Sequence, residues 1–78
     1  MMDFSFMSKQ IKIILQKQYN RNKIRDKDVA HALGLEPIYF AVIKRRGKIP
    51  YESLAYFCKK HQINMLWILF GNKPVYIA

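Results

Sequence analysis

The chain has 78 residues, of which 51% are hydrophobic, so it predicts one domain over 1–78 with enough apolar residues for a compact core. Its single cysteine excludes an internal disulfide framework, and its two histidines leave too few soft ligands for structural zinc. Fourteen Lys and Arg against five Asp and Glu give a net charge of +9, which favours a polyanionic partner, most simply nucleic acid.

Several functional classes are not expected. The N-terminus lacks a basic segment followed by an apolar one, so it does not resemble a signal peptide, and the apolar run 65–70 is too short to span a bilayer. We therefore expect a cytoplasmic protein without a membrane partner. No nucleophile–base pair, metal cluster or phosphate loop is visible, so we expect no enzyme, no catalytic residues, no metal, no cofactor and no small-molecule ligand.

The first helix is expected over about 8–19, with Ser8 or Ser5 as its N-cap. For residues 1–7 one expectation is a loose N-terminus, and the other is that Phe4 and Phe6 pack under this helix. Apolar residues at helical spacing predict its inner stripe, namely Ile11, Ile14 and Leu15, continued by Gln18 or Tyr19.

Two further helices are expected in the segment 28–43 and its flanks. The first starts near Asp26, its expected N-cap, and ends at Leu33, where Gly34 can adopt the left-handed conformation that ends a helix. The second starts near Glu36 and Pro37 and ends near Arg46, followed by Gly47. The spacing of small and apolar residues predicts a helix-turn-helix core made of Val29, Ala30, Leu33, Gly34, Leu35, Phe40 and Ile43.

The last two helices complete an all-α domain. Pro50 is expected to open a helix that runs to about Lys60, with Leu54, Phe57 and Cys58 facing inward. A short helix over 65–70 follows, capped by Asn64 and ended by Gly71. Because this helix is apolar on every side, we expect it to be buried on several sides. One of these sides is expected to pack against a second copy of the chain or against another surface. Residues 72–78 form a tail with a β-prone segment at 75–77.

Three motifs, taken together, resemble the helix-turn-helix domain of the lambdoid phage repressor (CI-like) family in the Cro/repressor group. They are VAHALGL at 29–35, KRRGKIPYESL at 44–54 and INMLWILFG at 63–71, and the resemblance covers about 24–71. It implies a five-helix fold that presents the second helix of the pair to DNA, and usually a dimer on a palindromic operator. Arg46 matches a basic position of the family.

In such a pair, the start and the outward face of the second helix read bases in the major groove. The corresponding positions here are Glu36, Pro37, Ile38, Tyr39, Ala41 and Val42. The family generally has Ser, Thr, Asn or Gln at several of them, whereas this chain has apolar residues. Apolar side chains can contact thymine methyl groups, and a glutamate can accept from a cytosine amino group. The alternative is that this face packs on a protein.

Basic residues flank the same helix pair and are candidates for contacts with DNA phosphates, which fix register without reading sequence. They are Lys23, Arg25 and Lys27 before the first helix of the pair and within its first turn, and Lys44, Arg45, Arg46 and Lys48 at the end of the second. The alternative for each cluster taken alone is a solvated charged face.

The sequence thus predicts a sequence-specific DNA-binding transcriptional regulator that binds double-stranded DNA as a homodimer. The alternative function is a helix-turn-helix protein-interaction module, an adaptor or an antitoxin-like partner, that uses the apolar face at 36–42. The candidates for the dimer interface lie in the short last helix and the tail, namely Trp67, Ile68, Phe70, Val75, Tyr76 and Ile77. For Trp67 the alternative is a position in the core.

Overall fold

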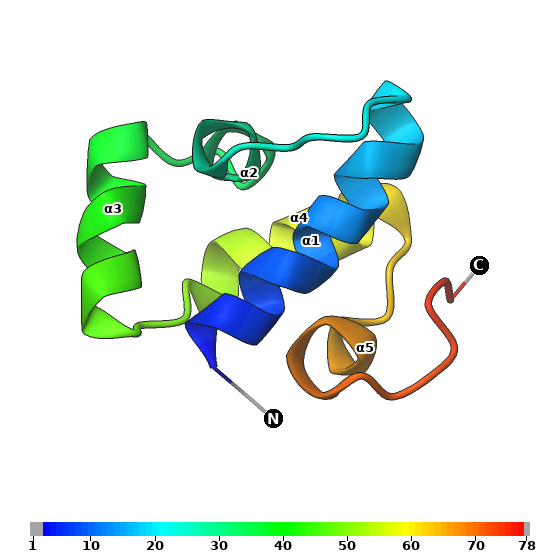
Figure 1. Cartoon of the computed structure of the whole chain (residues 1–78). Coiled ribbons are helices and arrows are strands. Elements are labelled where there is room, and N and C mark those ends of the chain that lie inside the picture. The colour runs from blue at the N-terminus through cyan, green and yellow to red at the C-terminus, as the bar shows by residue number, and fades with distance from the viewer. Residues whose placement is uncertain (1–2, 78) are drawn as a thin grey trace.

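Five helices, joined by short linkers, make up the fold in the computed structural model, which describes residues 3–77 (Figure 1). The helices are α1 (Phe4–Tyr19), α2 (Asp26–Ala32), α3 (Pro37–Arg46), α4 (Tyr51–His61) and α5 (Met65–Phe70). Within 3–77 there is no strand, and extended pairing is limited to one isolated antiparallel bridge between Ile63 and Tyr76. The expected all-α class and the order of the helices are confirmed. No helix in this range is long and apolar enough to cross a membrane.

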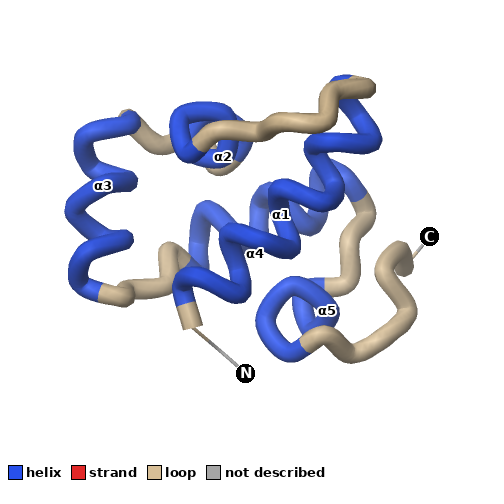
Figure 2. The backbone as a smooth tube through the Cα atoms, viewed as in Figure 1, coloured by secondary structure: helices blue, strands red, loops and turns tan. Residues whose placement is uncertain are grey.

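The first helix lies at the centre of the arrangement. α1 packs against α2 on one side and against α5 on another, and α4 packs against α5. α3 packs against α2 and forms one edge of the molecule, at the left of Figures 1 and 2. One face of α3 is therefore held by its neighbours while the other faces outward.

The start of α1 differs from the expectation. The helix begins at Phe4, four residues before Ser8, because the carboxylate of Asp3 accepts a hydrogen bond of 2.7 Å from the backbone N–H of Phe6 and so caps it. Phe4 and Met7 are buried, so the expected loose N-terminus is wrong for residues 3–7, and residues 1 and 2 lie outside the described range. Ser8 is itself buried within the helix.

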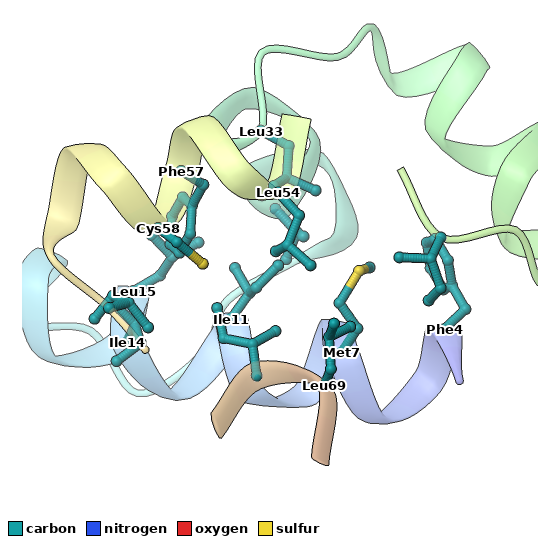
Figure 3. Packing of buried hydrophobic residues seen from close by; sticks show 14 of the residues in the cluster. Phe4, Met7, Ile11, Ile14, Leu15, Leu33, Leu54, Phe57, Cys58 and Leu69 are labelled. Atoms are coloured by element: carbon teal, nitrogen blue, oxygen red, sulfur yellow. The ribbon is translucent and has the colours of Figure 1, made fainter. Parts of the chain in front are cut away.

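The core contains the predicted inner stripes of the helices. Met7, Ile11, Ile14 and Leu15 of α1 face buried side chains of the other helices, as Figure 3 shows, including Leu33, Leu54, Phe57, Cys58 and Leu69. The continuation of the α1 stripe to Tyr19 is wrong, because this tyrosine and Gln18 are exposed in the last turn. There the Gln18 amide pairs instead with Nδ1 of His61, at 2.8 Å, near the exposed end of α4.

The ends of α2, α3 and α4 show how local chemistry sets their boundaries. Arg25 is the N-cap residue of α2, and Asp26, which the sequence predicted as the cap, is the first residue of the helix. Gly34 has φ +71°, and the backbone N–H of the next residue returns to the carbonyl of Ala30 at 2.8 Å, as predicted for the turn after α2. Pro37 opens α3 as expected, and Gly47 ends it, whereas Pro50 precedes α4 at the cap position.

The side chain of Asn64 makes hydrogen bonds both to the start of α5 and to the tail. The Oδ1 atom of Asn64 accepts from the N–H of Leu66, as expected for its N-cap, and its Nδ2 atom donates to the carbonyls of Asn72 and Pro74 at 3.2 and 2.8 Å. The same side chain thus caps α5 and fixes the tail. On the inner side, the amide of Gln10 in α1 donates to the carbonyl of Trp67 at 3.0 Å, which satisfies a buried polar group.

The thiol of Cys58 is buried in the core, and this burial raises its pKa from 9.0 to about 11. Because the folded pKa is raised, the thiol contributes stability that is present below pH 9 and is lost as the pH rises towards 11. At pH 8 we expect iodoacetamide to modify the native chain at least about 100-fold more slowly than the urea-unfolded chain, since the thiolate is the reactive form. Mass spectrometry of timed samples measures both rates, and equal rates would contradict the buried, inert thiol.

Candidate nucleic-acid interface

The helix α3 is anchored by two inward side chains. Phe40 and Ile43 are buried, three residues apart on one face, and the ring of Phe40 contacts the ring of Phe4 with centroids 5.2 Å apart. This contact connects α3 to the first turn of α1, the turn that the sequence did not predict. The inward face of α3 therefore fixes the direction in which its other residues point.

The outward face of α3 carries the residues that the sequence proposed for base contacts. Ile38 is 78% exposed and Tyr39 is 50% exposed. The other candidates are Glu36, Pro37 and Ala41, which are exposed, and Val42, which is half-buried. Glu36 is also the N-cap residue of α3 and makes no side-chain capping bond there. The face is accessible and apolar, as its sequence indicated.

A groove of about 360 Å³ lies between α2 and α3. Three of the predicted phosphate-contact residues line it together, because Lys27 comes from α2 and Lys44 and Arg45 come from the last turns of α3. The remaining lining residues are Asp26, Pro37, Phe40 and Ala41. The structure thus brings Lys27 together with two basic residues that lie 17 and 18 positions further along the chain.

A carboxylate that the sequence analysis had treated as a helix cap neutralises part of this groove. Asp26 accepts a hydrogen bond of 2.6 Å from Nζ of Lys44 with one oxygen, and its other oxygen lies 3.1 Å from Nζ of Lys12 in α1. The hydrogen bond from Lys44 is the largest of several effects that hold the pKa of Asp26 below its ordinary value. Lys44 is therefore engaged within the chain, and Lys12, which the sequence did not single out, joins the same surface.

The basic residues of the α1–α2 linker form a second concavity of about 310 Å³. It is lined by the predicted residues Lys23, Arg25 and Lys27, together with Arg21 and Asp28. Arg21 was not among the predicted phosphate contacts, although it belongs to the same basic run from 20 to 27. Lys27 lines both concavities, so the two basic surfaces meet at the first turn of α2.

The remaining phosphate candidates, Arg46 and Lys48, are exposed at the end of α3 and just after it. His31 in α2 is also exposed. Within 3–77 no group of three or more His, Cys, Asp or Glu side chains is placed to hold a metal ion. Lysine and arginine side chains outnumber the carboxylates in both concavities, and exposed apolar side chains lie beside them on α3.

The structure divides the candidates for a dimer interface. Ile68 is fully buried and Trp67 is 8% exposed, because α5 turns this side into the core beside α1 and α4, so Ile68 cannot contact a second chain from the folded state. Val75 is half-buried against the core. Phe70, Tyr76 and Ile77 are exposed, and so is Leu66, which the sequence analysis did not name.

Comparisons of this chain with protein-family models, with curated proteins and with solved structures find no match.

Proposed function

We propose that the chain is a sequence-specific DNA-binding transcriptional regulator in which α2 and α3 act as a helix-turn-helix. The observation that supports this most directly is the placement of α3, which lies at an edge of the molecule with its outward face exposed and basic residues beside it. In such units the second helix enters the major groove and flanking basic residues contact phosphates. The similarity of three motifs to phage repressors leads to the same proposal.

The division of labour within this surface follows from its chemistry. Exposed apolar side chains such as Ile38 and Ala41 can contact thymine methyl groups, and Tyr39 carries a hydroxyl that can reach a base or a phosphate. Contacts of arginine and lysine side chains with phosphates provide affinity without base discrimination. We therefore expect most of the binding free energy to come from phosphate contacts and only modest discrimination among sequences.

The test of this function is titration of the protein into random duplex DNA at several salt concentrations. Binding through several Lys and Arg contacts predicts an affinity that falls steeply with salt, with a log–log slope of about 0.9 for each phosphate neutralised. Fluorescence anisotropy of a labelled duplex measures this slope, and selection of preferred sites from a random DNA pool then tests base reading. Absence of binding even at low salt would reject the proposal.

A second function has an observation of its own in its favour. The 78% exposure of Ile38, next to Ala41 and Val42 on the outward side of α3, also suits a protein-interaction module, an adaptor or an antitoxin-like partner. Replacement of Tyr39 by alanine separates the two. A changed preference in the selected DNA sites supports base reading, whereas an unchanged preference with loss of self-association or partner binding supports the interaction module.

We also propose that the regulator acts as a homodimer through the exposed apolar residues of α5 and the tail, namely Leu66, Phe70, Tyr76 and Ile77. Several exposed large apolar side chains within a short segment are typical of a protein–protein interface. Sedimentation equilibrium should give an apparent mass that rises with protein concentration from 9.3 kDa towards twice that value. A mass that stays at 9.3 kDa over the whole concentration range would exclude the dimer.

A further inference from the structure

We propose that the concavity at the α1–α2 linker is a binding site for phosphate groups, centred on Arg21. Four cationic side chains, Arg21, Lys23, Arg25 and Lys27, line this space of about 310 Å³ together with one carboxylate, Asp28. Four positive charges and one negative charge leave an excess of three in a small volume. Such an excess favours the binding of a compact, multiply charged anion.

Arg21 is held in place before any ligand binds. Its guanidinium donates to Oδ2 of Asp28 at 3.1 Å and lies over the ring of Tyr19, with 5.4 Å from Cζ to the ring centroid. A guanidinium has five N–H donors in a planar fork that suits phosphate oxygens, and this fork keeps donors beyond the one used on Asp28. A positioned arginine loses less conformational freedom on binding, which favours affinity.

The backbone of the linker is anchored as well. The N–H of Arg21 donates to the carbonyl of Gln16 at 3.2 Å, and the amide of Gln16 donates to the carbonyl of Asn22 at 2.8 Å. At the other end, the N–H of Arg25 donates to Oδ2 of Asp28 at 3.0 Å. These bonds fix both ends of the segment that carries the four cations.

Most of this site lies apart from the outward face of α3, and Lys27 is the residue that it shares with the groove between α2 and α3. The linker follows the end of α1, away from the edge that α3 forms, as Figure 1 shows, and α2 lies between them. The site can therefore bind either a phosphate of a nucleic-acid backbone that continues beyond the groove beside α3 or the phosphates of a free phosphate ester. Both sources offer the same phosphate chemistry, and titrations with pyrophosphate and with duplex DNA distinguish them.

The test uses inorganic pyrophosphate and the full chain, with NMR observation of the backbone amides at low salt. We expect saturable binding with shifts centred on residues 21–28, and an affinity at least about tenfold weaker for Arg21→Ala. Lys73→Ala, which removes one exposed charge from the segment after α5, is the control and should stay within about twofold of the wild type. Arg21→Lys keeps the charge without the fork and should fall between them.

Either of two results would overturn the site: no saturation by pyrophosphate, or equal weakening by Arg21→Ala and Lys73→Ala, which would show that only net charge matters. Because the ion pair of Arg21 is exposed, its loss should leave the fold intact, and urea denaturation verifies this.

Titration of the same variants with duplex DNA identifies the source of the phosphate. If Arg21→Ala weakens DNA binding and lowers the salt slope by about one, the site binds the nucleic-acid backbone. If DNA binding is unchanged while pyrophosphate binding is lost, the ligand is a free phosphate ester. A wild-type chain that binds pyrophosphate but no DNA would retain the site and reject the regulator, so the two proposals fail separately.

Discussion

Replacement of Phe40 by alanine is expected to lower the free energy of unfolding by roughly 3–5 kcal/mol, the usual cost of truncating a buried phenylalanine. Phe40 is 2% exposed, and its ring packs on Phe4 with centroids 5.2 Å apart, so the change leaves a cavity between α3 and the first turn of α1. Small domains have only about 5–15 kcal/mol of stability, so a large part of the total would be lost. Urea denaturation followed by far-UV circular dichroism measures the change.

Ile38→Ala is the matched control for this prediction, since it truncates another large apolar side chain in the first turn of α3. Ile38 is 78% exposed, so its removal should change stability by no more than about 0.5 kcal/mol. Similar losses for the two variants would contradict the arrangement of α3 described above. A loss confined to Phe40 shows that α3 is oriented by its inward face, which is the condition for presenting its outward face to a partner.

The helix pattern could be predicted from the sequence because it depends on local signals. Gly34, Gly47 and Gly71 end helices by adopting positive φ, and Asn64 and Pro37 start them. The start of α1 was predicted at the wrong residue, because more than one residue near it can act as an N-cap. Asp3 caps α1 in place of the two serines, which lie one and four residues inside the helix. The choice depends on whether Phe4 and Met7 find a core to enter, and that is a tertiary property.

The electrostatic arrangement of the candidate interface could be predicted only in part. The basic residues of 23–27 and 44–48 are visible as runs in the sequence, and they are exposed in the structure. Which of them are paired is not visible, because Lys12, Asp26 and Lys44 come from three different helices. Arg21 belongs to the basic run from 20 to 27, but its pairing with Asp28 in the next helix is likewise not visible in the sequence.

The second large effect concerns the two arginines that end α3. Arg45 and Arg46 are exposed, and the structure gives neither of them an ion pair with any residue in 3–77, in contrast to Lys44. If they bind phosphates beside the major groove, the double variant R45A/R46A should bind random duplex DNA about 10- to 100-fold more weakly at about 0.1 M salt. The log–log slope against salt should fall by about two, because two fewer counterions are released.

The double variant K59A/K60A distinguishes a specific surface from net charge. It also removes two exposed positive charges, so both variants lower the net charge of +9 by two, but its residues lie in the last turn of α4. Long-range attraction depends on net charge and is screened over about 10 Å at 0.1 M salt, so it should weaken both variants slightly and equally. A much larger loss for R45A/R46A assigns DNA binding to the end of α3. Equal losses would mean that the net charge of the chain attracts DNA without a defined binding face. The proposed DNA-binding function of the helix-turn-helix would then be rejected in favour of the protein-interaction module.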